Sequence, residues 1–180
     1  MIAEANIIAE DRDGNPILIV EIKVTDASQA DILAFLNRFV KAAPTLEFAM
    51  FVDLEQIMVM KSDLANPQNP LVTLKTLDVL QFYDPDFAGK NSNYGSIGIF
   101  RDYFATLVEA WIRDLAYHWK SQTPPGTEEL TGTGLLELLE GGMTKRDVTI
   151  VVSPLHRMDS GENSRWQSAN VMQPSRWLPT

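Results

Sequence analysis

The sequence predicts an α/β (α+β) fold, with a mixed sheet made of a hairpin, a crossover helix and two further strands, followed by a mainly helical C-terminal extension. Three observations lead to this prediction. Two β-branched, apolar runs flank a turn-forming segment near the N-terminus. A helical repeat of apolar residues separates them from a second pair of short apolar runs. Helical periodicity then dominates the second half of the chain.

The N-terminal hairpin is the clearest of these elements. Residues 7–9 and 17–24 are dominated by Ile, Leu, Val and Ala, and the β-branched members favour strands. Between them, Asp13-Gly14 suits a two-residue type I′ loop, because both residues tolerate the positive φ angles that this loop requires. The second run is apolar on both of its faces and therefore predicts a central, covered strand.

A crossover helix is expected to follow the hairpin. Asp26 or Ser28 can cap its N-terminus, and the helical pattern continues to about Lys41. One side of this helix is apolar at helical spacing, through Ala30, Ile32, Leu33, Leu36, Phe39 and Val40. Residues 47–52 and 56–60 then have the composition of two short strands. This order of elements is typical of a sheet with a crossover helix.

The rest of the chain is mainly helical in pattern. We expect a short helix over residues 74–82, and the strongest helical periodicity runs over residues 96–120. A further helical pattern covers residues 128–140 and ends at a pair of glycines. Residues 147–152 have the composition of one more strand.

These patterns divide the chain into three parts. Residues 1–61 form a sheet core, and residues 62–159 form a helical extension with one extra strand packed on that core. Residues 160–180 are an unassigned tail. With 180 residues, the chain is long enough to bury a substantial core.

The composition limits the classes of function. The chain has no cysteine, so it has no disulfide, no thiolate nucleophile and no cysteine-bound zinc. It has no apolar run long enough to span a membrane and no signal-peptide pattern, so we expect a cytoplasmic protein that does not enter membranes. Its formal net charge of −9 at pH 7 predicts weak binding to nucleic acid by the chain alone, because phosphate contacts need Lys and Arg.

A polar patch is expected where the hairpin strands leave the core. If the predicted loop forms, residues that oppose each other across the hairpin have numbers that sum to 27, so Asn6 faces Glu21 and Glu4 faces Lys23. Because side chains alternate along a strand, all four would project from one face of the hairpin. The register therefore predicts two carboxylates, an amide and an ammonium group in one patch.

This set of groups suits phosphodiester hydrolysis. Carboxylates bind Mg²⁺ or Mn²⁺, and such an ion polarises a phosphoryl group and helps to generate hydroxide. Lys23 can orient the attacking water or stabilise developing negative charge. A Glu-x-Lys sequence also occurs at strand ends where both side chains simply reach solvent, and the local pattern leaves that alternative open.

Residues 4–61, with Val-Glu-Ile-Lys at residues 20–23 closing the second strand, resemble the PD-(D/E)XK nuclease superfamily. Within it, they are most similar to the N-terminal domains of type I restriction-enzyme motor subunits and to related cyanobacterial proteins of unknown function. The resemblance covers about a third of the chain. It implies a restriction-endonuclease-like fold and a metal-dependent nuclease.

The resemblance also implies roles for individual residues. Glu21 would be a metal ligand and Lys23 the catalytic lysine. The first acidic ligand of the family stands where this chain has Asn6, so Glu21 would hold the metal with help from Asn6 itself or from Glu4, which lies one pleat away and could compensate. Gln29 lies near a glutamine that some of these nucleases carry.

Two other functions stay open at this point. The chain could be a catalytically degenerate member of the family that binds a protein partner or nucleic acid without cutting it. It could also be a structural or assembly protein that forms a homo-oligomer through its aromatic helix. Tyr103, Phe104, Trp111 and Trp119 recur there at helical spacing, which is more often the pattern of a core. Loss of an oligomer in Trp111→Asp would support the assembly function.

Overall fold

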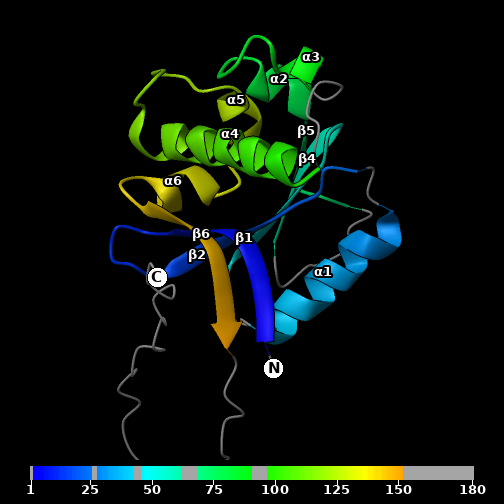
Figure 1. Cartoon of the computed structure of the whole chain (residues 1–180). Coiled ribbons are helices and arrows are strands. Elements are labelled where there is room, and N and C mark those ends of the chain that lie inside the picture. The colour runs from blue at the N-terminus through cyan, green and yellow to red at the C-terminus, as the bar shows by residue number, and fades with distance from the viewer. Residues whose placement is uncertain (1, 26–27, 43–45, 62–68, 91–96, 152–180) are drawn as a thin grey trace, which may run out of the picture.

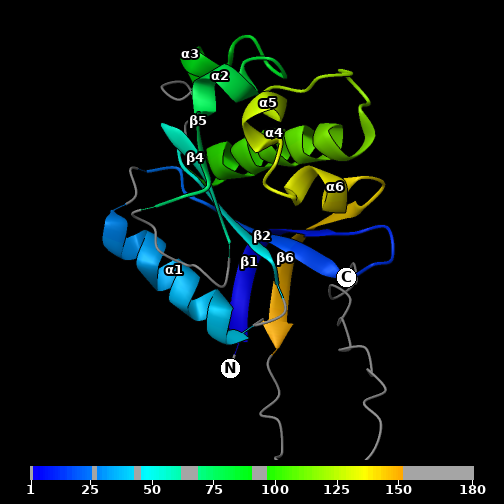
Figure 2. The same cartoon turned by 180° about the vertical axis from the view of Figure 1, so that it is seen from behind.

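The computed structural model describes residues 2–25, 28–42, 46–61, 69–90 and 97–151, with the side chains of residues 2–4, 40–42, 97 and 150–151 outside this description. In the described residues, six strands form a mixed sheet in the order β5-β4-β3-β2-β1-β6. Helices lie on both faces of this sheet (Figure 1; Figure 2, seen from behind). The predicted α/β class with a mixed sheet is therefore confirmed.

The hairpin consists of β1 (Ile2–Glu10) and β2 (Pro16–Ile22), which run antiparallel. Its predicted register is confirmed, because Ile7 pairs with Val20 and the two residue numbers sum to 27. The residues of β2 from Ile17 to Ile22 are all buried, as expected for a central strand with neighbours on both sides.

The predicted two-residue loop is wrong. The connection is longer, and the Asp11 N–H donates to the Asn15 carbonyl at 2.9 Å across it. The Asp11 carboxylate accepts the backbone N–H groups of Asp13 and Asn15 at 2.9 and 2.8 Å and so holds this wider turn. Gly14 has a φ of 83°, the one positive value within this loop. Pro16 has no N–H to donate to the strand ladder. The register of the pairing shifts at a bulge between Ala9 and Glu10, so Glu10 lies opposite Pro16.

The crossover predicted after the hairpin is confirmed. Helix α1 (Gln29–Ala42) connects β2 to the parallel strand β3 (Phe48–Val52), and β4 (Gln56–Lys61) returns antiparallel to β3. Ser28 caps the helix, since its Oγ accepts the Asp31 N–H at 3.2 Å while the Asp31 carboxylate accepts the Ser28 N–H at 3.0 Å.

The C-terminal extension supplies both edge strands. Strand β5 (Val72–Lys75) pairs with β4, and β6 (Met143–Val151) pairs with β1. Between them lie five helices of the described residues: α2 (Thr76–Leu80), α3 (Phe87–Lys90), α4 (Ile97–Tyr117), α5 (Thr127–Leu130) and α6 (Leu135–Leu139).

Two predicted boundaries in this extension are wrong. The helix expected from residue 74 begins at Thr76, because Val72 and Leu74 alternate with exposed residues as an edge strand. The helical pattern over residues 128–140 forms two short helices, α5 and α6, with its break at Gly132 and Gly134, whose φ angles of 84° and 88° end a regular helix. Strand β6 begins at Met143, four residues before the predicted start.

Two hydrophobic clusters cover the two faces of the sheet. Helix α1 packs Phe35 and Phe39 against one face, where Ile19 and Phe51 are buried. Helix α4, with α2, α5 and α6, covers the other face and contributes Trp111, which is completely buried. Both faces are thus apolar and shielded, and polar side chains meet where the strands end.

The aromatic stripe of α4 is mostly core, as its spacing suggests. Phe104 and Trp111 are fully buried, and the Trp111 indole N–H donates to the Pro125 carbonyl at 2.8 Å. Trp119 lies beyond the helix and is 56% exposed. Because Trp111 has no surface to offer a partner, loss of an oligomer in Trp111→Asp would report a damaged core and would not identify an interface.

None of the helices in the described residues is both long and apolar enough to cross a membrane.

Candidate functional site

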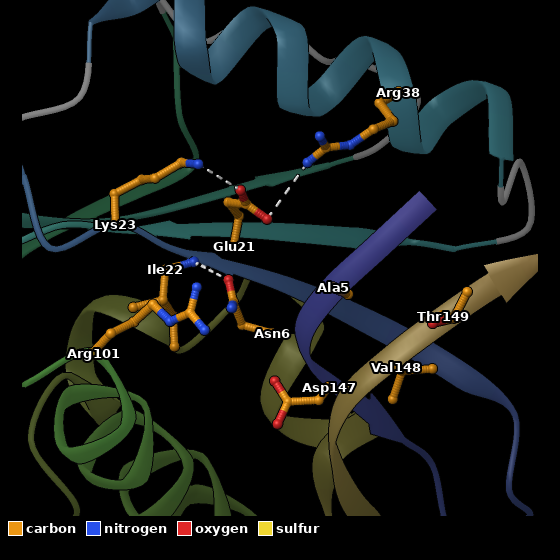
Figure 3. A pocket seen from close by; sticks show the side chains of 10 residues that line it. All are labelled: Ala5, Asn6, Glu21, Ile22, Lys23, Arg38, Arg101, Asp147, Val148 and Thr149. Carbon is orange, nitrogen blue, oxygen red and sulfur yellow. Dashed lines mark hydrogen bonds and ion pairs between the residues drawn. The ribbon is translucent and has the colours of Figure 1, made fainter. Parts of the chain in front are cut away.

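A cavity opens where β1 and β2 stop pairing with each other. The ladder between them extends only as far as Ile7 and Val20, and beyond this point β2 continues beside β3 while β1 continues beside β6. The sheet therefore divides like a fork, and the cavity at the division has a volume of about 510 Å³. We call it the fork cavity; its lining residues are Ala5, Asn6, Glu21, Ile22, Lys23, Arg38, Arg101, Asp147, Val148 and Thr149 (Figure 3).

One side of the fork cavity holds a triad of charges on the α1 face of the sheet. Alternation with Ile19 directs Glu21 toward this face, and its side chain is only 11% exposed. The Lys23 Nζ lies 3.0 Å from one carboxylate oxygen of Glu21, and an Arg38 guanidinium nitrogen lies 3.5 Å from the other (Figure 3). The sequence prediction that Glu21 and Lys23 lie together at the end of β2 is confirmed.

Arg38 is a site residue that the sequence argument missed. It belongs to α1, between Phe35 and Phe39, which anchor the helix against the sheet. Its guanidinium also lies 5.2 Å from the centre of the Phe39 ring. The sequence does show a basic residue beside the apolar face of the crossover helix. Its distance from the end of β2, however, depends on how the helix packs on the sheet, which the sequence pattern does not reveal.

The electrostatics of Glu21 follow from its burial. A carboxylate that is removed from water must be paired or hydrogen-bonded to remain charged. Lys23 and Arg38, at 44% and 43% side-chain exposure, supply this pairing while keeping part of each cation in contact with the cavity. Glu21 therefore holds two cations side by side at the mouth of the fork.

The predicted placement of Asn6 on the same face as Glu21 is wrong. In Figure 3 its side chain lies on the opposite side of β2 from Glu21, and its Oδ1 accepts the Ile22 backbone N–H at 2.7 Å. The reason is a break in alternation along β1: Ala5 belongs to the cluster on the α1 face, whereas Ile7 belongs to the cluster on the α4 face. The Asn6 side chain thus takes the place of a backbone hydrogen bond between β1 and β2.

The other side of the fork cavity contains Arg101 and Asp147, which no sequence pattern predicts as site residues. Arg101 lies near the start of α4, and Asp147 lies in β6 with a φ of 49°, an uncommon left-handed conformation for a residue with a side chain. The ladder between β1 and β6 continues on both sides of Asp147, where Val148 pairs with Ala5 and Arg146 pairs with Ile7, so this kink falls within the strand beside Asn6. Neither residue carries a motif, and tertiary structure alone brings them to the cavity.

Two other predicted site residues are Glu4, a possible metal ligand, and Gln29, an auxiliary residue. The backbone of Glu4 pairs with Thr149, but its side chain lies outside the described residues. Gln29 is the first residue of α1, is exposed and is not among the residues that line the fork cavity. Their predicted roles as metal ligand and auxiliary residue therefore stay predictions.

The described residues do not fit a Mg²⁺ or Mn²⁺ ion. Within them, no group of three or more His, Asp or Glu side chains is placed to hold a metal. Glu21 already faces two cations, which would repel a third positive charge, and the Asn6 oxygen is engaged by the Ile22 N–H. We therefore derive no metal-dependent step from this geometry.

The geometry is better suited to an anion. Among the described residues, three basic side chains, Lys23, Arg38 and Arg101, line the fork cavity against two acidic ones, Glu21 and Asp147. This local excess of positive charge stands out in a chain with a formal net charge of −9. Arginine and lysine donors arranged in this way bind phosphate and carboxylate groups.

Outside the fork cavity, two neighbouring acidic residues, Asp84 and Asp86, have a structural role. The Asp84 carboxylate accepts hydrogen bonds from Lys90 and from the Tyr103 hydroxyl, the latter at 2.5 Å. These hydrogen bonds, chiefly the one from Lys90, lower the pKa of Asp84 to about 2. The carboxylate also accepts the Asp86 N–H at 3.0 Å, so the Pro85-Asp86 sequence belongs to a turn that links α2 and α3.

Searches of family models, of curated proteins and of solved structures find no match to this chain.

Proposed function

We propose that this chain is a PD-(D/E)XK-like module that binds a phosphate group of nucleic acid in the fork cavity and does not cut it. The observation that supports the proposal is the convergence of Lys23, Arg38 and Arg101 on one polar cavity at the end of β2. The nuclease-like character rests on the resemblance of residues 4–61. The binding function rests on the positive charge of these three side chains.

Lys23 and Arg38 retain donors for a ligand while they pair with Glu21. An ammonium group has three N–H donors and a guanidinium has five, and each of these side chains makes one ion pair with the carboxylate. A phosphate that enters the cavity can therefore accept from both without displacing Glu21. In this function Glu21 is a positioning residue: it orders two flexible cations before the ligand arrives, which lowers the entropic cost of binding.

Metal-dependent hydrolysis is the second candidate function. The observation that favours it is the 3.0 Å contact between Lys23 and Glu21, the two residues to which the family resemblance assigns catalysis. It would require Lys23 and Arg38 to release the carboxylate and another acidic ligand to join it. The protein can also be a partner-binding or oligomeric module, which the fork cavity by itself does not favour.

The test is phosphate-dependent binding of a short oligonucleotide. Fluorescence anisotropy with a 5′-phosphorylated, 3′-labelled 12-nucleotide strand is measured in low salt with EDTA present. We expect Lys23→Ala and Arg38→Ala each to weaken binding by about tenfold, because each removes a charge-assisted hydrogen bond. Lys75→Ala and Arg113→Ala are matched controls, since both residues are exposed and neither lines the fork cavity.

Two results would change this proposal. Equal losses in the cavity variants and the controls would show that binding is diffuse and does not use the fork cavity. Cleavage of plasmid or single-stranded DNA with Mg²⁺ or Mn²⁺, abolished by both Glu21→Ala and Lys23→Ala, would establish the nuclease instead. Circular dichroism of every variant separates these outcomes from loss of folding.

A further inference from the structure

We infer that the fork cavity accepts a single phosphorylated nucleotide unit, either a free mononucleotide or the terminal nucleotide of a strand, and not a continuous length of backbone. This inference rests on the proposed function, because it specifies which phosphate the cavity binds. Three features of the described residues carry it: the size of the cavity, the distribution of charge around it and the pairing of the basic residues elsewhere.

The size of the fork cavity matches a small ligand. Its volume of about 510 Å³ lies within the range of about 300–1,000 Å³ that is usual for sites that bind small molecules and cofactors. The cavity lies between strand ends, where β1 and β2 part. One nucleotide fills such a space, whereas a duplex could touch only its mouth.

The charges in the cavity favour a terminal phosphate over an internal one. A phosphate monoester carries about −1.5 to −2 charges near pH 7, whereas a phosphodiester carries one. Lys23 and Arg38 approach from the α1 side, and Arg101 approaches from the α4 side of β2 (Figure 3). Among the described residues no ion pair joins Arg101 to an acid, so this cation is available to a ligand without breaking an existing pair.

The surface of the described residues outside the cavity offers little to a longer backbone. Most basic residues of the described chain outside the cavity already pair with a carboxylate: Arg12 with Glu140, Lys61 with Glu47, Lys90 with Asp84, Lys145 with Glu10 and Arg146 with Glu109. Lys120 donates to the Phe82 carbonyl at 2.6 Å and lies over the Phe82 and Tyr83 rings. Among the described residues, a strand that leaves the cavity therefore meets mostly cations that already face a carboxylate, on a chain of net charge −9, and gains little from additional phosphates.

Asn6 is placed to contact the same ligand without contributing charge. Its Oδ1 is engaged by the Ile22 N–H, which leaves the amide Nδ2 as a donor at the cavity wall. A neutral donor beside Arg101 suits the sugar or base of the bound nucleotide. A carboxylate at this position would repel the phosphate.

The experiment compares ligands that differ in length and in phosphorylation. Calorimetric titrations use adenosine, adenosine 5′-monophosphate and oligo-dA of 4, 12 and 24 nucleotides, each oligonucleotide with and without a 5′-phosphate. We expect affinity that depends on the monoester, that stays within about threefold from one to 24 nucleotides, and that has a log–log salt slope of about −2. A backbone-tracking protein with six to ten contacts has a slope several times steeper.

Arg101→Ala identifies the cavity as the site of this binding. We expect about tenfold weaker binding of the mononucleotide, with Arg113→Ala on the same helix as the matched control. Equal affinity for the mononucleotide and the phosphorylated 12-nucleotide strand identifies the monophosphate itself as the recognised group. Binding of the phosphorylated strand alone identifies the strand end.

The possible failures of the two proposals are distinguishable. Affinity that rises steadily with length, or that ignores the 5′-phosphate while still requiring Lys23 and Arg38, overturns this inference and leaves the proposed phosphate binding intact. Failure of every ligand to bind overturns both. Mononucleotide binding that is unchanged in Arg101→Ala overturns the placement of the ligand in the fork cavity.

Discussion

Replacing Glu21 by glutamine distinguishes a phosphate site from a metal site, because the two predict opposite results. Glutamine has nearly the same shape and keeps a carbonyl oxygen that can accept from Lys23, which lies 3.0 Å from the carboxylate. It removes one negative charge from a cavity lined by three basic and two acidic side chains. Because glutamine still accepts from Lys23, the variant keeps part of the order that Glu21 gives to the cations, while the repulsion between its carboxylate and an anion is removed. An anion should therefore bind more tightly to the variant, whereas a metal ion should lose a principal ligand.

The expected magnitude follows from the geometry of Glu21. A phosphate oxygen bonded to Lys23 would place its charge about 5–6 Å from the carboxylate, given ordinary hydrogen-bond lengths. Two unit charges at that separation repel each other by about 0.8 kcal/mol in water-like surroundings. We therefore expect adenosine 5′-monophosphate to bind at least about fourfold more tightly to Glu21→Gln than to the native protein.

The assay is a calorimetric titration with adenosine 5′-monophosphate, first with EDTA and then with Mg²⁺. Glu47→Gln is the matched control, because Glu47 pairs with Lys61 at 3.7 Å and does not line the fork cavity. Weaker binding in Glu21→Gln at unchanged thermal stability would refute the electrostatic reasoning. Binding that needs Mg²⁺ and disappears in the variant would point to a metal site.

Two further predictions concern other polar positions. Asn6→Asp keeps an acceptor for the Ile22 N–H and adds a negative charge to the cavity wall, so we expect about fourfold weaker mononucleotide binding by calorimetry; unchanged binding would contradict the assigned geometry. Asp114 is completely buried and accepts from the Tyr83 hydroxyl at 2.8 Å and the Lys120 backbone N–H at 2.7 Å. Asp114→Ala should lower the free energy of unfolding by about 3 kcal/mol and the melting temperature by roughly 6–12 °C, because it leaves buried donors without acceptors. Asp114→Asn retains an acceptor and should cost about 1 kcal/mol, and equal melting temperatures for the two variants would count against this role.

The register of the hairpin was predictable although its loop was not. Alternation of apolar residues fixes which strand positions share a buried face, and Ile7 and Val20 pair as that pattern requires. The loop depends on the Asp11 side chain, whose carboxylate holds a wider turn. Two loops can therefore give the same strand pairing, with the difference absorbed by a bulge at the end of the ladder.

The edges of the sheet were harder to predict than its centre. A buried central strand such as β2 is apolar at nearly every position and is visible in the sequence. The edge strand β5 is only four residues long and alternates, so it merged with the helical pattern that follows it. Short edge strands gain their stability from a neighbour that is distant in sequence, and local propensity does not contain that information.

The sequence by itself determined the core sheet, the crossover helix and the pairing of Glu21 with Lys23, because strand alternation places residues two apart on the same side. Only the tertiary structure decided that Arg38 and Arg101 join them and that Asn6 lies on the other side of β2. The positions of Arg38 and Arg101 depend on how α1 and α4 pack on opposite faces of the sheet. The position of Asn6 depends on a local break in the alternation of β1. Periodicity predicts which face a side chain occupies only while the strand stays regular, and the fork cavity forms where that regularity ends.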